Sequence, residues 1–581
     1  MKRIIALILA LVMTMALVAC GGDKPASSTP TNPDTPSNPT ASTPGTTNSG
    51  TSTDKPAEDP DAWKYGGDMV IGTGNAWTSF DPHQDSVSSL DNKYMAAHCV
   101  EGLALKDING KTYPQVCDVT ESADGLTVTV KLRERYFSNG DKITMEDVLA
   151  SIQRGAALLT ESSFKKQWNG VTMKVEGDTI IFTLEKFNVE FFRGLVSDGT
   201  RYRVLPKEIC DKYPVTGGEL QPCGLVMGGT APNIDKVEDL IGSGPYKLTK
   251  YTEEEFTLSR NENYTAIEND AVGIAAPARC YLDTITFQLN KDAASRTAAT
   301  MAGDYHIGSV SNEMVEQAKA MGVKVDKAGT TWTHGIFFNL DASNSDSPVY
   351  NVNVRKAIRA ILDVDAIMLS ICGGDKNKID YPLTPTPVVK ENTAYHNTML
   401  VDSGEWNIKD ADKAKAYLAA ANYDGTPIVY LTHASGAFYN AAMVIIPMME
   451  SIGLKVELMA VDNGSHSALR KDPKTGHDIG CWEVQKWLDS PLHSTFVAGT
   501  QGWWDHPVRT ETIETMKNKP LNSAESVAAY EKYTQLVIDE CPYILFGNPT
   551  GTVAYRENVV RASVGQLNYY YWNDYFTDNK K

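Results

Sequence analysis

The sequence predicts a mixed α/β protein with more than one hydrophobic core. Its 581 residues allow two to four structural units of ordinary domain size. Segments with the two-residue period of strands alternate along the chain with segments of helical period. After the first twenty residues there is no run of eighteen apolar residues, which argues against an integral transporter.

Charge and cysteine content exclude further classes of protein. The formal net charge is −18, and loss of Lys2 and Arg3 with a leader would leave 52 basic against 72 acidic residues, or −20. No basic run follows Arg3, so a nucleic-acid or anionic-membrane partner is not expected, because phosphate contacts need clustered Lys and Arg. Nine cysteines in a chain of this length are too sparse for a disulfide-built scaffold.

The N-terminus has the features of an export signal. Met1-Lys2-Arg3 is positively charged. The apolar stretch 4–19, in which only Thr14 is polar, has the length of a signal-peptide core. Leu17-Val18-Ala19-Cys20 resembles the lipobox of bacterial lipoproteins. The resemblance implies a signal peptide over 1–19, a diacylglycerol on Cys20 and anchoring at the extracytoplasmic face of the cell membrane. An ordinary secretory leader with a chance cysteine is the alternative.

Residues 20–62 are predicted to be a disordered tether. Of the 33 residues in 25–57, 22 are Ser, Thr or Pro, and none is aromatic or Leu, Ile or Val. Such a segment cannot bury enough apolar surface to fold, and as a flexible coil it would span roughly 30 Å. A spacer above a membrane, a glycosylated stalk and a mere linker remain alternative interpretations.

The folded body begins near Trp63 with a short strand over 67–72 and a turn containing Gly72 and Gly74. A phosphate loop would need a third glycine and a Lys-Ser/Thr ending, which are missing, so we interpret the glycines as a turn.

Strand and helix patterns then follow in order. Residues 126–132 alternate apolar and polar side chains, and Thr144 begins a helix as Thr-Met-Glu-Asp, with an acid three residues after the cap. A turn that leads into a strand is predicted over 242–249, and further strands are predicted over 255–260, 282–289, 332–340 and 455–459. Further helices are predicted over 293–301 (ended by Gly303), 354–369, 411–421, 443–452 (kinked or begun at Pro447) and 524–538.

Five of these segments carry a family resemblance. Residues 123–154, with Leu-Arg-Glu-Arg-Tyr-Phe-Ser-Asn-Gly, resemble the signature region of family 5 extracellular solute-binding proteins, the peptide, nickel and oligopeptide binders of ABC importers. Similar blocks follow in the family's order at 242–264, 353–365, 412–418 and 448–458.

The resemblance implies the two-lobe fold of periplasmic binding proteins, with the solute held in a cleft between α/β lobes. Lobe 1 is expected at 63–330 plus 544–581, with an inserted subdomain at about 103–192, and lobe 2 at 331–543. The chain would cross between lobes near 330–333 and 542–547. The implied function is that of a monomeric receptor that captures a peptide or similar small organic solute and delivers it to an ABC permease, without a cofactor.

No enzyme motif competes strongly with this interpretation. Gly-x-Ser-x-Gly, His-Glu-x-x-His and Cys-x-x-Cys are missing, and the ten histidines are scattered singly, so no metal site is expected. Carboxylates are abundant, so counting does not exclude a catalytic pair. A surface carbohydrate-active or peptide-cleaving hydrolase and a non-transport adhesin therefore remain the alternatives.

Eight cysteines remain after Cys20. Their even number permits disulfides, and a bond between Cys210 and Cys223 would close a short loop around two glycines. Buried free thiols are the alternative.

The candidate ligand contacts are aromatic residues near predicted strand ends with a few polar neighbours. In peptide-binding relatives, a stretch shaped like Gly-Trp-x-x-Asp-Tyr-x-x-Pro supplies an aspartate for the ligand's amino terminus. Here the comparable stretch is 480–491, where that position falls on Trp487 or Gln485, and neither is acidic. The expected contacts are Asn75, Trp77, Trp332, His334, Trp482, Glu483, Trp487 and Asp489, with Glu483 or Asp489 as partners for a cationic group.

Overall fold

The computed structural model describes most of the folded body. The described residues are 60–84, 90–107, 111–196, 202–271, 273–311, 314–328, 332–388, 392–485, 502–562 and 570–579. The predicted leader, residues 20–59 of the predicted tether, and the candidate contacts Trp487 and Asp489 lie outside them. Within these ranges, no helix combines the length and apolarity that crossing a membrane requires.

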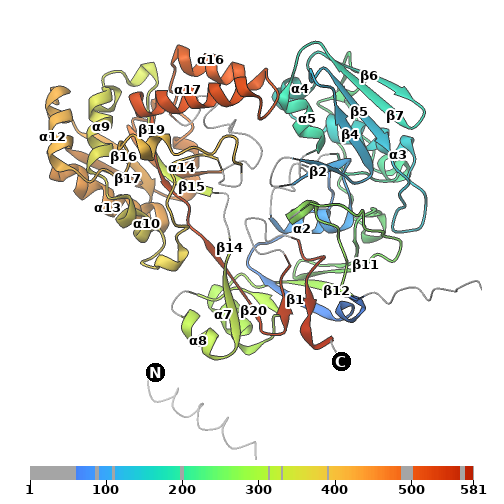
Figure 1. Cartoon of the computed structure of the whole chain (residues 1–581). Helices are drawn as coiled ribbons and strands as arrows, with labels where there is room; N and C mark the ends of the chain where they lie inside the picture. The colour runs from blue at the N-terminus through green and yellow to red at the C-terminus, as the bar shows by residue number, and fades with distance from the viewer. Residues whose placement is uncertain are drawn as a thin grey trace, which may run out of the picture. The chain divides into compact units, whose positions relative to one another are not determined.

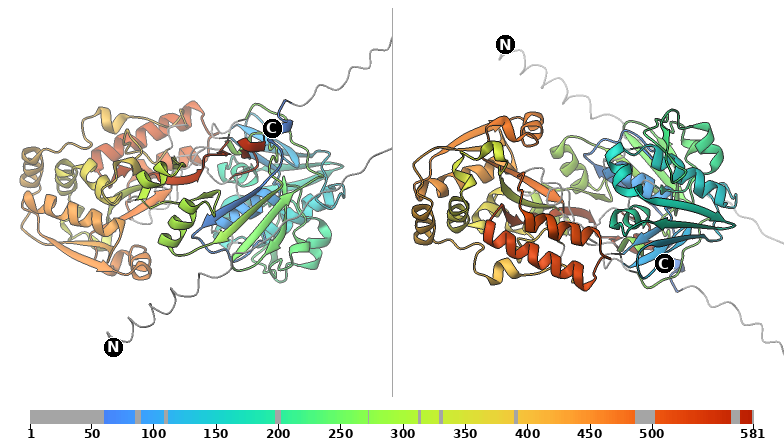
Figure 2. Two further views of the ribbon diagram at one scale, coloured as in Figure 1. Left: turned by 90° about the horizontal axis from the view of Figure 1, so that it is seen from below. Right: turned by 90° about the horizontal axis from the view of Figure 1, so that it is seen from above.

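The first sheet contains seven strands in the order β10-β11-β12-β1-β13-β20-β14. β1 runs parallel to β12 on one side and to β13 on the other, and Figure 2 shows β1 in blue beside the light-green β12. Met69 and Ile71 of β1 are buried in the core beneath this sheet. The strands are β1 (Asp68–Thr73), β10 (Tyr246–Tyr251), β11 (Glu255–Arg260), β12 (Thr284–Leu289), β13 (Ile307–Gly308), β14 (Val323–Ala328) and β20 (Gly551–Arg556).

The second sheet contains five strands in the order β17-β16-β18-β15-β19. Its strands are β15 (Trp332–Phe338), β16 (Ile428–His433), β17 (Val456–Val461), β18 (Ile479–Gln485) and β19 (Tyr543–Gly547). The helices in this part of the chain are α9 (Val352–Ile361), α10 (Val364–Ile371), α11 (Met399–Asp402), α12 (Ala411–Ala420), α13 (Ala437–Ser451), α14 (Asn463–Leu469), α16 (Pro507–Lys517) and α17 (Ala524–Glu540). The orange-red helices α16 and α17 lie side by side (Figures 1 and 2).

A four-stranded antiparallel sheet, β4-β5-β7-β6, forms a separate core with α3, α4 and α5. Its elements are β4 (Cys117–Glu121), β5 (Thr127–Leu132), α3 (Met145–Ala157), α4 (Glu161–Trp168), β6 (Val171–Glu176), β7 (Thr179–Leu184) and α5 (Val189–Val196). The core contains residues from Leu103 to Leu225. The remaining helices include α2 (Leu90–Cys99), α6 (Lys207–Lys212), α7 (Ala293–Ala302) and α8 (Val315–Ala320). Three short strand pairs complete the fold: β2 (Ala104–Lys106) with β3 (Thr112–Pro114), β8 (Glu219–Leu220) with β9 (Val226–Met227), and β21 (Val559–Val560) with β22 (Tyr575–Phe576).

The chain passes between the two large sheets twice. It leaves the first sheet after β14 and enters the second at β15, and it returns between β19 and β20. The predicted limit of the second lobe at residue 543 is wrong, because 543 is the first residue of β19, which pairs with β15 in the second sheet. Pro542 precedes a strand that still belongs to this lobe, so the return follows Gly547.

Helix ends were predicted where a polar cap marks them. The Thr144 hydroxyl accepts a hydrogen bond from Asp147 N, and the Asp147 carboxylate accepts one from Thr144 N at 2.8 Å, which is a complete capping box. Gly303 ends α7 with a φ of 86°.

The single helix predicted over 354–369 is wrong. The structure has two helices, because Leu362 is extended and Asp363 starts α10 by accepting a hydrogen bond from Ala366 N at 3.1 Å. Pro447 lies inside α13, so that helix does not begin there.

The predicted disulfide is also wrong. Cys210 and Cys223 are free, and so are the other six described cysteines, all of them buried. Cys210 packs in the core of the first sheet and Cys223 in the core of the four-stranded sheet, so the short loop joins two different cores. Burial raises the pKa of the Cys210 thiol to about 11.

Candidate functional site

The second sheet brings one end of every strand to a common edge. β16 is parallel to β17 and β18, and β18 and β19 both run antiparallel to β15, so four strands end where β15 begins. Open α/β sheets bind ligands outside the carboxyl ends of their strands. The edge is formed by His433, Gln485 and Gly547 at strand ends and by Trp332 at the start of β15.

His334 and Glu483 face each other across this edge. They are register partners on β15 and β18, and His334 Nε2 lies 3.4 Å from a Glu483 carboxylate oxygen. His334 is only 5% exposed, and burial lowers its pKa to about 4, so the imidazole is neutral at pH 7. Burial raises the pKa of Glu483, and Arg470 opposes that shift.

Aromatic rings and two further histidines adjoin this pair. Phe438, in the first turn of α13, has its ring centre 5.4 Å from that of His334 and 4.9 Å from that of His433. The ring centre of His433 in turn lies 4.3 Å from that of His466. Burial and the positive charges of its neighbours, Arg470 and the imidazoles of His433 and His477, lower the pKa of His466 to about 4. In the part of the chain that the structure describes, no three His, Cys, Asp or Glu side chains are arranged to hold a metal ion.

The predicted tryptophans have different environments. Trp332 is 42% exposed at the start of β15, whereas Trp482 is buried and stacks on Phe337 at 4.5 Å with an interplanar angle of 6°. Trp77 is buried as well, and its Nε1 donates to Thr252 O at 2.6 Å. The expectation that Trp77 and Trp482 present open aromatic walls is therefore wrong, because both complete the core of a lobe.

The first sheet has a corresponding edge. β1, β12, β13 and β14 run in one direction, and the loop 73–79 leaves the end of β1 there with Asn75 exposed. The turn was predicted from Gly72 and Gly74, but Gly72 lies within β1. A Cβ on Gly72 would lie 2.3 Å from the Tyr305 ring, so a close neighbour requires glycine there. A Cβ on Gly74 would lie 2.7 Å from Arg296 Nη1, which is the end of a flexible side chain that can move away.

Beside this loop the first lobe is hollowed. An open pocket of about 650 Å³ is lined by Lys250, Thr252, Glu253, Glu254, Glu255, Gln288, Leu289, Asn290 and Tyr305. Its volume lies within the usual range for small-molecule sites. The Trp77 indole N–H donates a hydrogen bond to the Thr252 carbonyl oxygen in the wall of the pocket, and Asn290 N donates to Thr73 O at 2.8 Å. These lining residues were not predicted from the sequence, because a turn between two strands carries no signal of what it faces.

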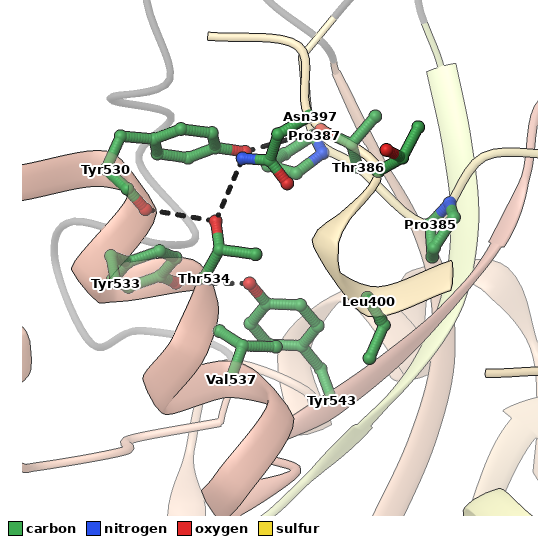
Figure 3. Close-up of a pocket in the computed structure, with 11 residues that line it drawn as sticks. Pro385, Thr386, Pro387, Asn397, Leu400, Tyr530, Tyr533, Thr534, Val537 and Tyr543 are labelled. Atoms are coloured by element: carbon green, nitrogen blue, oxygen red, sulfur yellow. Dashed lines mark hydrogen bonds between the residues drawn. The ribbon is translucent and has the colours of Figure 1, made fainter. Parts of the chain in front are cut away.

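Two smaller cavities do not fit a solute. One, of about 20 Å³, lies between α17, β19 and residues 385–387 and 397–400, and it is lined by Tyr530, Tyr533 and Tyr543 (Figure 3). Tyr533 and Tyr543 share a hydrogen bond of 3.2 Å between their hydroxyls. The other, of about 40 Å³, lies in the first lobe beside Glu101 and Trp572. Each has room for a few water molecules at most.

Comparisons with known proteins place the chain in a family. The family model described as the middle region of the bacterial extracellular solute-binding proteins, family 5, matches residues 103–507. The oligopeptide-binding protein AppA of Bacillus subtilis is 21% identical over 551 residues, which cover 89% of this chain and 92% of AppA. The periplasmic oligopeptide-binding protein OppA of Haemophilus influenzae is 23% identical over 369 residues, covering 60% of this chain but only 63% of OppA.

The fold is shared with solved structures. The ABC transporter substrate-binding protein CtaP of Listeria monocytogenes superposes with a TM-score of 0.69 at 19% identity, covering 88% of this chain and 100% of CtaP. This likeness confirms the predicted two-lobe fold of periplasmic binding proteins. Since the family model covers well over half of the sequence, the chain belongs to family 5 of the bacterial extracellular solute-binding proteins.

Proposed function

We propose that the protein captures a peptide or a similar small organic solute between its lobes and delivers it to an ABC permease. Family membership makes the chain an extracytoplasmic receptor rather than an enzyme. The observation that carries the proposal is that each large sheet presents the carboxyl ends of its strands, one beside a pocket of about 650 Å³ and the other at the His334–Glu483 pair. The names of AppA and OppA favour a peptide.

The two connections between the sheets support a hinge. Among the described strands, the chain passes from one large sheet to the other between β14 and β15 and between β19 and β20, and the second connection is residues 548–550. Short paired connections of this kind allow two lobes to close on a ligand as rigid bodies. A solute that contacts both lobes would stabilise the closed form, which the permease would recognise.

A screen tests this function against its alternatives. A receptor gains thermal stability by mass action, about 2.7 kcal/mol at a hundredfold excess over the dissociation constant. We expect a thermal shift with members of a panel of peptides, sugars, amino acids and metal complexes, and recovery of the bound compound unchanged by mass spectrometry. A compound recovered cleaved would indicate a hydrolase, and no shift with any compound would favour the adhesin.

We also propose that Cys20 carries a lipid anchor. A single acyl chain binds membranes only marginally, so stable attachment needs the two or three chains of a lipoprotein. The native protein should therefore partition into detergent, and Cys20→Ser should release or misprocess it. Intact-mass measurement of the native protein checks this, and an N-terminus other than a lipidated Cys20 would contradict it.

A further inference from the structure

We infer that an apolar contact between the start of α5 and the second lobe holds the two lobes together on the side away from the hinge. We call this contact the clasp; its side on α5 consists of Phe187 and Val189. The inference rests on the proposed function, since it takes the lobes to separate and to close on a solute. It adds a contact that sets how readily they close and that is made outside both strand edges.

The short helix α5 contributes side chains to two different cores. Later in the helix, Phe191 and Leu195 pack in the core of the four-stranded sheet. Val189, its first residue, is only 4% exposed and belongs instead to the core cluster of the second sheet, against which Phe187 also packs. Every other described buried member of that cluster lies between residues 336 and 546. The start of α5 therefore joins two bodies that are otherwise separate in the sequence.

The start of α5 is fixed within its own body. The Asn188 amide donates a hydrogen bond to Lys166 O at 3.0 Å, at the end of α4, and its carbonyl oxygen accepts one from Glu190 N at 3.1 Å. The Phe187 ring lies against Gly125, where an added Cβ would be 2.3 Å from a ring carbon. Both apolar neighbours of Asn188 are therefore presented to the second lobe from a rigid support.

The second lobe meets α5 at the start of α17. Figure 1 and the right-hand view of Figure 2 show one end of α17 beside α4 and α5. The other end leads into β19 of the second sheet, so the end beside α5 is the one that begins at Ala524. Leu521 lies three residues before Ala524 and packs against the same cluster as Val189. We therefore assign Leu521 to the second lobe's side of the clasp.

Contacts at the hinge respond much less to an opening of the lobes. The return connection 548–550 is bound to the second lobe, because Asp380 N donates to Asn548 O at 3.0 Å and Thr550 N donates to Lys378 O at 2.6 Å. In Figure 1, β14 and β20 beside this connection lie at the bottom, whereas α5 and α17 lie at the top. A rotation about a hinge moves atoms further the more distant they are from its axis. A small rotation therefore separates the clasp and leaves the hinge contacts intact.

The clasp lowers the free-energy cost of closing the lobes. Its apolar surfaces are removed from water when they meet and are returned to water when the lobes separate, which favours the closed form. A receptor that is closed more often without solute binds the solute with a higher apparent affinity. Residues that do not touch the solute can thus set the affinity.

Distance measurement between two spin labels by pulsed electron resonance tests the inference without any solute. Lys174→Cys on β6 and Glu531→Cys on α17 provide exposed attachment points, whereas the eight described native thiols are buried. The labelled protein with an intact clasp should show mainly the separation that the structure has. Val189→Ser and Leu521→Ser should each lower the ratio of short to long separations by about fivefold or more, because each removes apolar contact. Leu220→Ser is the matched control, since Leu220 is 73% exposed on β8 and lies outside the described core clusters.

Each outcome has a definite meaning. Unchanged separations in both Val189→Ser and Leu521→Ser would overturn the inference, and so would an equal shift in Leu220→Ser. A shift in Val189→Ser alone would support the clasp and overturn the assignment of Leu521. The protein without the two introduced cysteines, treated in the same way, shows whether any native thiol takes up label. Because no solute is added, the result is independent of the thermal-shift screen, so failure of the clasp and failure of the receptor function are told apart.

Discussion

Asp81 forms a buried ion pair with Arg154 of α3, the helix that packs on the four-stranded sheet. Its carboxylate accepts hydrogen bonds from Arg154 of α3 at 2.6 and 2.8 Å and from Ile234 N at 3.1 Å. Arg154 also contacts His83 Nδ1 at 3.1 Å. Burial alone would raise the pKa of Asp81, but Arg154 outweighs it, so the pKa is lowered. The Asp81 carboxylate and the Arg154 guanidinium are almost completely removed from water, so each charge is compensated by the other.

Asp81→Asn should therefore destabilise the protein strongly. Removing one partner of a buried pair leaves the other charge uncompensated, which typically costs about 3–5 kcal/mol in the free energy of unfolding. Asp118→Asn is the matched control, because Asp118 pairs with Arg133 at the surface and such pairs contribute about 1 kcal/mol or less. Urea unfolding measures both variants. Equal losses in the two would show that the Asp81 pair is no more important than a surface one.

At the scale of elements, the sequence predicted what local chemistry determines. Thr144 and Gly303 mark helix ends by their own side-chain and backbone properties, and alternation marked β5 correctly. The break between α9 and α10 was missed because Asp363 was interpreted as part of a helix instead of as a cap. Exposure of the tryptophans was not predictable either. Trp332 and Trp482 both lie on strands of one sheet, and only the packing of Phe337 against Trp482 decides which ring is covered.

Gly335 on β15 illustrates how closely the strands of the second sheet approach. A Cβ at this position would lie 2.6 Å from Ile544 O and 3.2 Å from Leu545 Cα of β19, so backbone atoms would have to move. We expect Gly335→Ala to lower the free energy of unfolding by about 1–3 kcal/mol, as overpacking of a core does.

Gly464→Ala is the comparison for that variant. Its added methyl group would meet only the Asp462 side chain, at 3.2 Å, and alanine is preferred in helices by up to about 1 kcal/mol. Its stability should stay within about 1 kcal/mol of the wild type. Denaturant unfolding compares the two variants, and a Gly335→Ala protein as stable as Gly464→Ala would show that β19 can shift freely.

At the scale of the whole molecule, three buried histidines couple stability to pH. Burial lowers the pKa of His83, His334 and His466 to about 4, against 6.5 in the unfolded chain. Below pH 6.5 the unfolded state therefore binds more protons than the folded state, so stability falls as the pH drops from 6.5 toward 4.

The expected loss at pH 5 is about 2 kcal/mol for each of these histidines, since each pKa unit corresponds to about 1.4 kcal/mol. Urea unfolding at pH 7.5 and pH 5 measures it. His334→Gln should show a pH-dependent loss smaller by about 2 kcal/mol than the wild type. An identical pH dependence in the variant would mean that His334 is accessible to protons in the folded state.

The overall architecture was predictable because the five family blocks span the body in the family's order. Once the family's fold is known, the position of a strand in the sequence tells which sheet it joins. The pocket beside β12 was not predictable. Its wall combines a turn at 252–255 with a strand end at 288–290 and Tyr305, which only the register of β11 with β12 brings together.

The eight buried thiols have a consequence for how the exported chain matures. Burial raises the pKa of Cys99, Cys280 and Cys481 to about 12 in each case, so at neutral pH these sulfurs are protonated and shielded from oxidants. No cross-link has to form among the eight described thiols for the fold to close. Acquisition of the native state after export is thus independent of any oxidising catalyst, and a receptor of this design would keep its shape in reducing, oxygen-free surroundings as well as in air.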